Sequence, residues 1–588
     1  MVRRALIDTP RKLAGQVRPA LRIAVLLALL AACGPVQLRR TAEVTSPIGT
    51  AQAAGSQLRS AADSARLAPM VLPMVLGVQT HFSQGWPQST LALAQQVGAP
   101  MLRDSLPWAE AEKVRGSYRL DGPAAQALGA ACKGGQRLLL TAVPVNPLYD
   151  GGQWVSSAAG NAAFAAYLAA LTDRFGPCLA AIEVGNEING PGTLVYPAGV
   201  NRMAAYVATL KAVRARIGGR TAILGGSTNT IGTGFLKNLF AAGMLKEVDA
   251  IAVHPYRSRA EGLDIELGAL NAAMDAAGRR VPIWASELSM DTRNEPLGAG
   301  ELVKQTTMLA AGSVAQASWY ALIDQRWYPT MGLFAGRTPK AQARAFTLMQ
   351  RVLAGGRPQR LDLGDPLLFA YRFGADTTVI WGAPRSLQVE GGQVSDATGA
   401  PLTAASISES PLVITGTTAI RFGASTWIAD TLMGWGTPQW RYGVRLKGDA
   451  SYRLPLFDDQ FTSYFGDRWY RPLRINTTSA APGGTGAAPM RAVWRHVAAA
   501  TQSLDVGGCF AKTAAGDGVD LTIIASGKVL WRGVLTGQVQ LPPLSADLAA
   551  GDALELVAGP NQTTGGDSFN LRLVLFRRGA GEPVSCPQ

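Results

Sequence analysis

The sequence predicts a closed (β/α)8 barrel of eight parallel strands, followed by a small antiparallel β-domain and a C-terminal β-sandwich. Between residues 70 and 355, short runs that are apolar on both faces alternate with longer segments of helical periodicity. Such strands are typical of a parallel sheet covered by helices. Eight units of this kind fit a barrel, and an open doubly wound sheet is the competing arrangement.

Each predicted barrel strand is a short apolar run bounded by polar or helical segments. The runs cover residues 74–79, 100–104, 137–143, 179–184, 221–226, 248–253, 281–286 and 316–322. Helical periodicity is clearest at residues 161–174, 201–215 and 339–353. After residue 355 the pattern changes to short alternating stretches between Gly, Pro and Asp residues, which predicts antiparallel strands.

The N-terminal segment has the pattern of an export signal that ends at a cysteine. Arg18 and Arg22 precede the apolar run 23–32, which is too short to cross a bilayer. The run ends Leu-Ala-Ala-Cys33 and resembles the lipobox of bacterial lipoproteins. This resemblance implies cleavage before Cys33, lipidation of Cys33, and a periplasmic or cell-surface protein anchored by lipid to the outer membrane. An ordinary signal peptide is the alternative.

These patterns divide the chain into five segments. They are a signal peptide of lipoprotein type (1–32), a tether (33–69), the barrel (70–357), the small β-domain (358–423) and the sandwich (424–588). The aromatic-rich stretch 424–480 favours the core of a sandwich, with carbohydrate stacking as the alternative.

The composition is that of a globular chain with a basic surface. Apolar residues make up 47% of the chain and charged residues 16%, which excludes wholesale disorder. The net charge is +14, and residues 1–32 hold six of the basic side chains and one acid. The remaining excess fits a mildly basic surface or a preference for an acidic polymer. Nucleic acid is not an expected partner, because no run of Lys and Arg is interleaved with aromatic residues.

The few histidines and cysteines limit the chemistry. Three His and five Cys exclude a His-rich metal centre and a zinc-finger array. The Gly-rich stretch 225–227 lacks the G-x-G-x-x-G spacing and any Walker lysine. We expect neither a metal nor an organic cofactor. Beyond Cys33, an even number of cysteines in an exported chain permits two disulfides. Proximity in sequence favours Cys132–Cys178 and Cys509–Cys586, and buried free thiols are the alternative.

Two glutamates end predicted strands that lie three apart in the barrel. In such barrels the chemistry sits at the carboxyl ends of the strands. The fourth run leads into Asn186-Glu187 and the seventh into Glu287. Both acids are therefore placed to face each other across the barrel mouth. Glu183, inside the fourth run, is a competing acid that we expect to be structural.

The residues around these acids resemble clan A of the glycoside hydrolases, whose catalytic domain is a TIM barrel. Asn186-Glu187 matches the Asn-Glu pair after strand four, and Trp284-Ala-Ser-Glu287 matches the nucleophile strand. Further matches are His254-Pro-Tyr256 after strand six, Arg103 after strand two and Trp319 on strand eight. The resemblance covers about residues 70–355 and is greatest to family 39, with family 5 next.

The resemblance implies retaining hydrolysis by two carboxyl groups about 5–5.5 Å apart. Glu287 would be the nucleophile, and Glu187 the acid/base with a pKa raised by burial and by Glu287. Substrate binding would involve Arg103 and Tyr256 beside Glu287, Asn186 at the sugar 2-hydroxyl, His254 beside Glu187 or a hydroxyl, and Trp319 stacked on a sugar ring.

Structural roles remain open for several of these residues. Arg103 alternatively pairs with Asp104 or Glu110, and His254 and Trp319 alternatively belong to the core. Residues at other predicted strand ends, where loop structure is an equal alternative, are His81, Asn146 and Tyr149.

The sequence thus predicts an exported, lipid-anchored, monomeric glycoside hydrolase for a β-linked poly- or oligosaccharide. A bacterial exopolysaccharide is the leading substrate, and xylan-type or cellulose-type glucans come next. The alternatives are a non-catalytic polysaccharide-binding lipoprotein and a transglycosylase of exopolysaccharide assembly.

Overall fold

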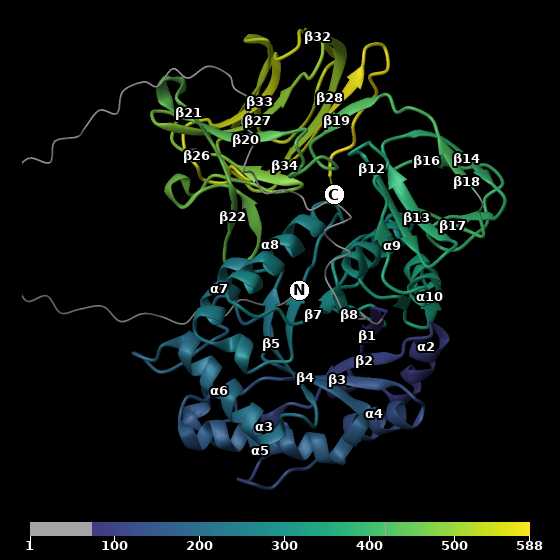
Figure 1. Cartoon of the computed structure of the whole chain (residues 1–588). Helices are drawn as coiled ribbons and strands as arrows, with labels where there is room; N and C mark the ends of the chain where they lie inside the picture. Colours follow the sequence, from purple (N-terminus) through teal and green to yellow (C-terminus); the bar gives the residue numbers. More distant parts are fainter. Residues whose placement is uncertain (1–72, 418, 588) are drawn as a thin grey trace, which may run out of the picture. The chain divides into compact units, whose positions relative to one another are not determined.

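The structure, a computed structural model, describes residues 73–417 and 419–587, and its first part is a closed parallel barrel (Figure 1). Its eight strands follow each other in chain order, and the barrel closes where β1 pairs with β8. The strands are β1 (Val75–Gln79), β2 (Met101–Ser105), β3 (Arg137–Ala142), β4 (Leu179–Val184), β5 (Ala222–Asn229), β6 (Ala250–His254), β7 (Ile283–Leu288) and β8 (Val314–Trp319). Closure confirms the predicted barrel and excludes the open sheet.

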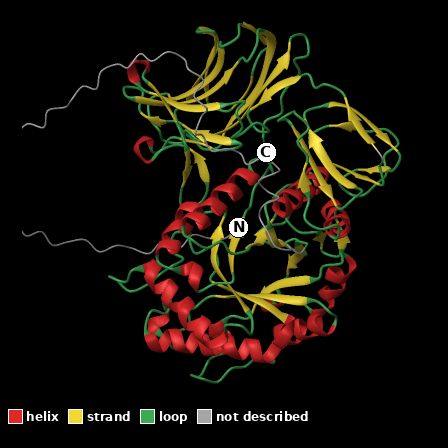
Figure 2. Cartoon of the chain, in the orientation of Figure 1, coloured by secondary structure: helices red, strands yellow, loops and turns green. Residues whose placement is uncertain are grey.

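Helices cover the outside of the barrel strands (Figure 2). They are α2 (Leu91–Gln96), α3 (Trp108–Ala111), α4 (Pro123–Lys133), α5 (Ala158–Phe175), α6 (Arg202–Ile217), α7 (Thr233–Ala241), α8 (Leu263–Ala276), α9 (Glu295–Ala311) and α10 (Ala341–Leu353). The longer ones begin at side chains that accept hydrogen bonds from the first turn, namely Ser157, Asn201 and Asn294. The three helices predicted from periodicity are α5, α6 and α10.

Inward-facing side chains form an apolar layer below a polar layer. Because alternate residues of a strand face the same side, one strand can contribute to both layers. The apolar cluster contains Met101, Leu139, Ala181, Leu224, Ala250 and Ala252, with Trp284 packed against it. Two positions further along their strands lie Arg103, Thr141, Glu183, His254 and Ser286. The polar layer therefore lies at the carboxyl ends of the strands and forms the floor of the barrel mouth.

Antiparallel strands follow the barrel, as predicted. Residues 359–422 form a five-stranded sheet, β11-β12-β13-β17-β15, and a three-stranded sheet, β16-β14-β18. The strands are β11 (Gln359–Arg360), β12 (Leu368–Phe373), β13 (Thr377–Gly382), β14 (Arg385–Glu390), β15 (Gln393–Ser395), β16 (Ser406–Ile407), β17 (Leu412–Thr415) and β18 (Ala419–Phe422).

Two larger antiparallel sheets then enclose a separate apolar core. Their strands are β19 (Trp427–Asp430), β20 (Arg441–Arg445), β21 (Ser451–Arg453), β22 (Leu456–Asp458), β23 (Ser463–Phe465), β24 (Arg474–Ile475), β25 (Ser479–Ala481), β26 (Gly483–Gly484), β27 (Pro489–Val497), β28 (Gln502–Lys512), β29 (Val519–Ala525), β30 (Lys528–Leu535), β31 (Gln538–Gln540), β32 (Leu544–Leu548), β33 (Ala553–Pro560) and β34 (Phe569–Arg577). Of the aromatic residues in the stretch 424–480, Trp435, Trp440, Tyr442 and Tyr464 are buried, whereas Tyr452, Phe461 and Trp469 are exposed. The stretch thus contributes to the core but is not entirely core.

The structure contains the two disulfides that the sequence favours. Cys132 at the end of α4 is bonded to Cys178 just before β4, and Cys509 of β28 is bonded to Cys586. Cys33 lies outside the described residues, as does the predicted signal peptide. No helix within the described part is long and apolar enough to cross a bilayer.

Candidate active site

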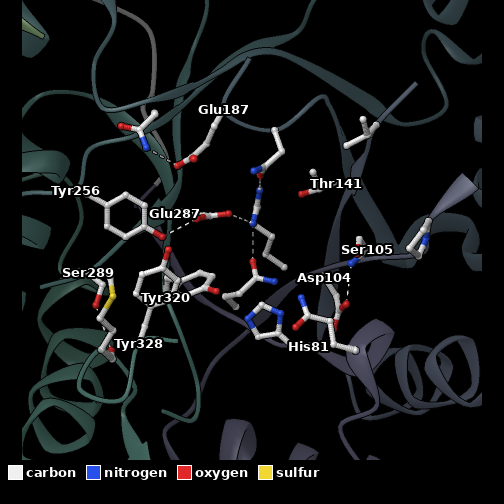
Figure 3. Close-up of a pocket in the computed structure, with 18 of the residues that line it drawn as sticks. His81, Asp104, Ser105, Thr141, Glu187, Tyr256, Glu287, Ser289, Tyr320 and Tyr328 are labelled. Carbon is white, nitrogen blue, oxygen red and sulfur yellow. Dashed lines mark hydrogen bonds and ion pairs between the residues drawn. The ribbon is translucent and has the colours of Figure 1, made fainter. Parts of the chain in front are cut away.

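A cavity of about 830 Å³ opens at the carboxyl ends of the barrel strands (Figure 3). This is the size range of sites for small organic ligands. The strand ends and the loops after them line it with Gln79, His81, Arg103, Thr141, Asn186, Glu187, Asn229, Tyr256, Glu287 and Tyr320, among others. The predicted acids therefore open into one hollow.

The carboxyl groups of Glu187 and Glu287 face each other in this cavity. One carboxylate oxygen of each, together with a ring nitrogen of His254, lies within 4.8 Å of the other two atoms. Figure 3 shows the two side chains pointing toward the same space. The side chain of Glu287 is 10% exposed and that of Glu187 is 31% exposed, so Glu187 is the more accessible to solvent.

The backbone around Glu187 is strained. Gly185 has φ +94°, and a Cβ there would lie 2.6 Å from Ile188 Cγ2, so only glycine fits. Glu187 itself has φ +47°, a left-handed conformation that costs a residue with a side chain about 1–2 kcal/mol. Hydrogen bonds hold the turn, since Ile188 N donates to Ser227 O at 3.1 Å and Gly190 N donates to Glu187 O at 2.8 Å. Strain at this residue is consistent with a functional role for its side chain.

Glu287 is held at both carboxylate oxygens. Arg103 Nη1 donates to Oε1, and the hydroxyl of Tyr256 donates to Oε2 at 2.5 Å. Burial and the neighbouring charge of Glu287 raise the pKa of Tyr256 well above its ordinary value, so Tyr256 remains a phenol that donates. A guanidinium has no acceptor, so Glu287 Oε1 must accept. These contacts orient Glu287 as a carboxylate.

Glu183 is the structural centre of the polar layer. It is fully buried and accepts hydrogen bonds from Arg103 Nε at 2.8 Å, Ser227 Oγ at 2.8 Å and Ser286 Oγ at 2.7 Å. Burial alone would raise the pKa of Glu183, but the charge of Arg103 and the hydrogen bond of His254 outweigh burial and hold it well below its usual range. Both carboxylate oxygens of Glu183 therefore accept hydrogen bonds from the protein, which supports the expectation that Glu183 is structural.

His254 lies between two acids, with Nδ1 3.3 Å from Glu187 Oε1 and Nε2 3.2 Å from Glu183 Oε1. Burial would lower the pKa of His254, but the charge of Glu287 and the hydrogen bonds to Glu183 and Glu187 raise it to about 9. His254 is therefore an imidazolium at neutral pH, with a proton at each nitrogen. It is not a neutral core histidine.

The predicted direction of the Glu187 pKa is wrong for the pocket without substrate. Burial does raise the pKa of Glu187, but the hydrogen bond and charge of His254, the hydrogen bond of Asn229 and the charge of Arg103 together place it below its ordinary value. The sequence prediction counted burial and Glu287 and left out the cations around the site. Glu187 is therefore ionised at neutral pH, and the nearest proton is on His254.

The raised pKa of His254 predicts a loss of stability at alkaline pH. Its folded pKa of about 9 exceeds the model-compound value of 6.5. The imidazolium therefore stabilises the fold fully below pH 6.5, and this contribution of roughly 3 kcal/mol is lost as the pH rises through about 9. Urea unfolding at pH 6 and pH 9 should show a larger drop in unfolding free energy for the wild type than for His254→Gln. An equal drop in the two proteins would contradict this assignment.

Asn229, at the end of β5, also holds Glu187 and was not singled out from the sequence. Its Nδ2 donates to Glu187 Oε1 at 2.8 Å. Asn189 fixes the backbone of Asn229, because its Oδ1 accepts from Asn229 N at 2.8 Å and its Nδ2 donates to Asn229 O at 3.0 Å. Asn189 Nδ2 also donates to Gln460 O at 2.9 Å, in the turn between β22 and β23. A segment distant in the sequence thus supports the surroundings of Glu187.

Arg103, Asn186, His254 and Tyr256 all lie at this site, but Trp319 does not. Arg103 Nη2 donates to Asn186 Oδ1 at 3.0 Å, which fixes the amide at the cavity wall. Trp319 is fully buried, and its Nε1 donates to Met331 O at 2.9 Å. The prediction that Trp319 stacks on a sugar is wrong, because its ring faces the core. The neighbouring Tyr320 lines the cavity instead.

Of the three residues at other predicted strand ends, one lies in the site and two lie in a loop. His81 lines the cavity, and burial lowers its pKa to about 4, so it is neutral at pH 7. Asn146 is buried and donates to Glu112 O at 3.0 Å. Tyr149 donates to Glu112 Oε1 at 2.7 Å. The last two organise a loop.

The two acids and His254 are also the kind of groups that bind metal ions, but their neighbours are cations. Arg103 donates to Glu287, and His254 carries a proton toward Glu187. A metal ion here would have to displace that proton and approach the guanidinium. This donor set favours proton transfer over cation binding.

Fold and site together define a (β/α)8 barrel with facing carboxyl groups at the carboxyl ends of strands four and seven. Solved structures with a similar fold are glycoside hydrolases of families 39 and 5, the two families that the sequence motifs resemble. The sequence matches no family model and no curated protein.

One similar structure is a family 39 glycoside hydrolase from Bacteroides cellulosilyticus WH2, with 16% identity and a TM-score of 0.50 over 58% of this chain and 81% of that chain. Another is the family 39 enzyme from Xanthomonas axonopodis pv. citri, with 12% identity and a TM-score of 0.41 over 84% and 95% of the two chains. A monomeric β-xylosidase from Caulobacter crescentus CB15 has 12% identity and a TM-score of 0.40 over 83% and 97%. At 16% identity, the likeness to the Bacteroides cellulosilyticus structure shows a shared fold alone.

Proposed function

We propose that the chain is a retaining glycoside hydrolase that cleaves β-linked poly- or oligosaccharides by double displacement. The observation that carries the proposal is the approach of Glu187 and Glu287 carboxylate oxygens to within 4.8 Å across the cavity. Retaining enzymes place their two carboxyl groups about 5–5.5 Å apart, whereas inverting enzymes need about 6.5–9.5 Å to admit a water molecule. The separation supports direct attack by one carboxylate.

The contacts of each acid assign the roles. Glu287, held by Arg103 and Tyr256, attacks the anomeric carbon and forms a glycosyl ester as the bond to the leaving oxygen breaks. Glu187 donates a proton to that oxygen. In the second step Glu187 accepts a proton from water, whose oxygen attacks the anomeric carbon and releases Glu287 as a carboxylate.

The proton for the first step is present in the site. In the empty pocket His254 Nδ1 holds it, 3.3 Å from Glu187 Oε1. A sugar bound between the acids removes water from Glu187, and loss of water raises the pKa of a carboxyl group. Substrate binding therefore shifts the shared proton toward Glu187, where it is needed.

A bacterial exopolysaccharide is the proposed substrate, and an exported protein anchored through Cys33 is the proposed context. The lipobox-like sequence before Cys33 supports this proposal, as does the net charge of +9 that remains for residues 33–588, which hold 49 basic and 40 acidic residues. A lipid anchor followed by a tether would hold the enzyme near surface polymers, and a basic surface attracts acidic ones.

Product stereochemistry tests the mechanism. The wild type and Glu287→Ala are incubated with aryl β-glycosides of different sugars. They are also incubated with soluble xylan, with glucomannan and with an acidic exopolysaccharide such as xanthan. We expect the wild type to hydrolyse at least one of them and to release the β-anomer first, as followed by proton NMR. Initial release of the α-anomer would contradict double displacement.

If both proteins bind a polymer and neither cuts any substrate, the chain is a binding protein. Transfer of sugar to another sugar in place of water would identify a transglycosylase.

A further inference from the structure

Trp327 is the most exposed large apolar side chain in the described part of the protein. It is 78% exposed and lies in the loop between β8 and α10. Its main neighbour is the guanidinium of Arg326, 5.0 Å from the ring centroid. An indole left in water forgoes the free energy of burial, and exposed apolar groups of this size commonly mark binding sites. The fold itself gives Trp327 no packing role.

The turn that carries Trp327 is built rigidly. Gln325 and Tyr328 exchange backbone hydrogen bonds of 3.1 Å in both directions, which leaves Arg326 and Trp327 at the tip. Below the tip, Lys340 Nζ donates to Asp324 Oδ1 at 2.9 Å and to Thr330 O at 2.8 Å. Because the turn is already ordered, a ligand that stacks on Trp327 loses little free energy in ordering it.

A row of aromatic rings connects this turn to Glu287. Tyr256, which donates to Glu287, has its ring centroid 6.3 Å from that of Tyr320, and Tyr320 is 6.0 Å from Tyr328. All three tyrosines line the cavity, and Figure 3 shows them on one side of it. Trp327 is the next residue along the chain from Tyr328. The row leads from the reacting carboxylate to Tyr328, the chain neighbour of the exposed indole.

We infer that Trp327 and Arg326 form an additional sugar-binding subsite at the rim of the cavity, so that the enzyme holds several consecutive units of a polysaccharide chain. This inference rests on the proposed function. A pyranose ring has a face of C–H groups that stacks on an aromatic ring, and its edge carries hydroxyl or carboxylate groups that accept from a guanidinium. Trp327 offers the aromatic ring, and the guanidinium of Arg326, which lies over that ring at 5.0 Å from its centroid, offers the donors.

Kinetics with substrates of different length test this subsite. The proteins are the wild type, Trp327→Ala and Trp469→Ala, and the substrates are an aryl β-glycoside and oligosaccharides of two to six units cut from whichever polymer the wild type hydrolyses. Trp469 is a matched control, because it is 73% exposed and lies 4.5 Å from the Arg468 guanidinium in the sandwich. For Trp327→Ala we expect KM for the longest oligosaccharides to rise about tenfold with kcat unchanged. The aryl glycoside and the Trp469→Ala variant should show no change. Equal effects on short and long substrates, or no effect on long ones, would overturn the inference.

A binding measurement separates this inference from the hydrolase proposal. Glu287→Gln, with and without Trp327→Ala, is run in native gels that contain xylan, glucomannan or xanthan. We expect at least one polymer to retard Glu287→Gln, and the added Trp327→Ala to weaken that retardation about tenfold in polymer concentration. If this holds while the wild type cuts nothing, the hydrolase proposal fails and the subsite stands. If no polymer retards the protein, or if the added Trp327→Ala leaves the retardation unchanged, the subsite proposal is wrong.

Discussion

Replacing Glu287 with Gln is expected to lower kcat for an aryl β-glycoside by at least about 10⁴-fold. The amide cannot form the glycosyl ester, and no other acid among the described residues can take its place at the anomeric carbon. Glu183 is buried and hydrogen-bonded, and Glu187 faces Glu287 across the cavity, so a sugar bound between the two acids would have Glu187 on its other side. Initial rates at saturating substrate, for proteins with matched circular dichroism spectra, measure the effect.

Two controls separate lost chemistry from lost folding. Glu183→Gln should lower the melting temperature more than Glu287→Gln. It replaces one of the two buried oxygens that accept from Arg103, Ser227 and Ser286 with an NH2 donor, and it leaves the charge of Arg103 without its buried partner. A slow 2-deoxy-2-fluoro glycoside should label the peptide that contains Glu287, as read by mass spectrometry. Label on Glu183 or Glu187, or more than about 1% residual activity in Glu287→Gln, would show that the nucleophile is assigned wrongly.

The strands were predictable wherever both of their faces are apolar. The predicted β5 ends at residue 226, but the strand continues to Asn229, through Ser227 and Thr228. These residues belong to the polar layer of the barrel mouth, where Ser227 binds Glu183. Hydrophobic periodicity does not reveal such a layer. Its polar side chains form hydrogen bonds with one another, so its residues show no apolar pattern in the sequence. The strand ends that carry chemistry are therefore the ones least visible in the pattern.

Neighbouring aromatics explain the error at β8. The sequence has Trp319 and Tyr320 in succession, and successive residues of a strand face opposite sides. Choosing the wrong one of the two exchanges a cavity residue for a core residue. The sequence predicted that an aromatic residue at the end of β8 lines the cavity, but it did not predict which of Trp319 and Tyr320 does so.

The pKa shifts of Glu187 and His254 could not be predicted from the sequence, for a different reason. The pKa of His254 depends on Glu183, Glu187 and Glu287, which come from two other strands. Local sequence places each acid at a strand end, but only the closed barrel brings them around one imidazole. The result reverses the expected direction for Glu187 and makes the proton a shared property of the pair Glu187 and His254.

The proton shared by Glu187 and His254 determines the expected effect of Glu187→Gln. We expect kcat/KM for substrates with sugar leaving groups to fall about 10²–10⁴-fold, because the departing alkoxide then receives no proton. A dinitrophenyl glycoside should lose far less in this first step, since dinitrophenolate leaves without a proton. Steady-state rates with leaving groups of graded acidity measure the difference between the two cases.

Added azide and the pH profile complete the test of Glu187. Azide attacks the glycosyl ester without needing a base, so it should speed turnover of the dinitrophenyl glycoside by Glu187→Gln and yield a β-glycosyl azide. In the wild type, kcat/KM should fall as the pH rises through about 9, where the Glu187 and His254 pair loses its shared proton. Glu187→Gln should lack this alkaline limb. Equal losses for all leaving groups, with no azide product, would mean that Glu187 holds the structure of the site and that the proton comes from another group.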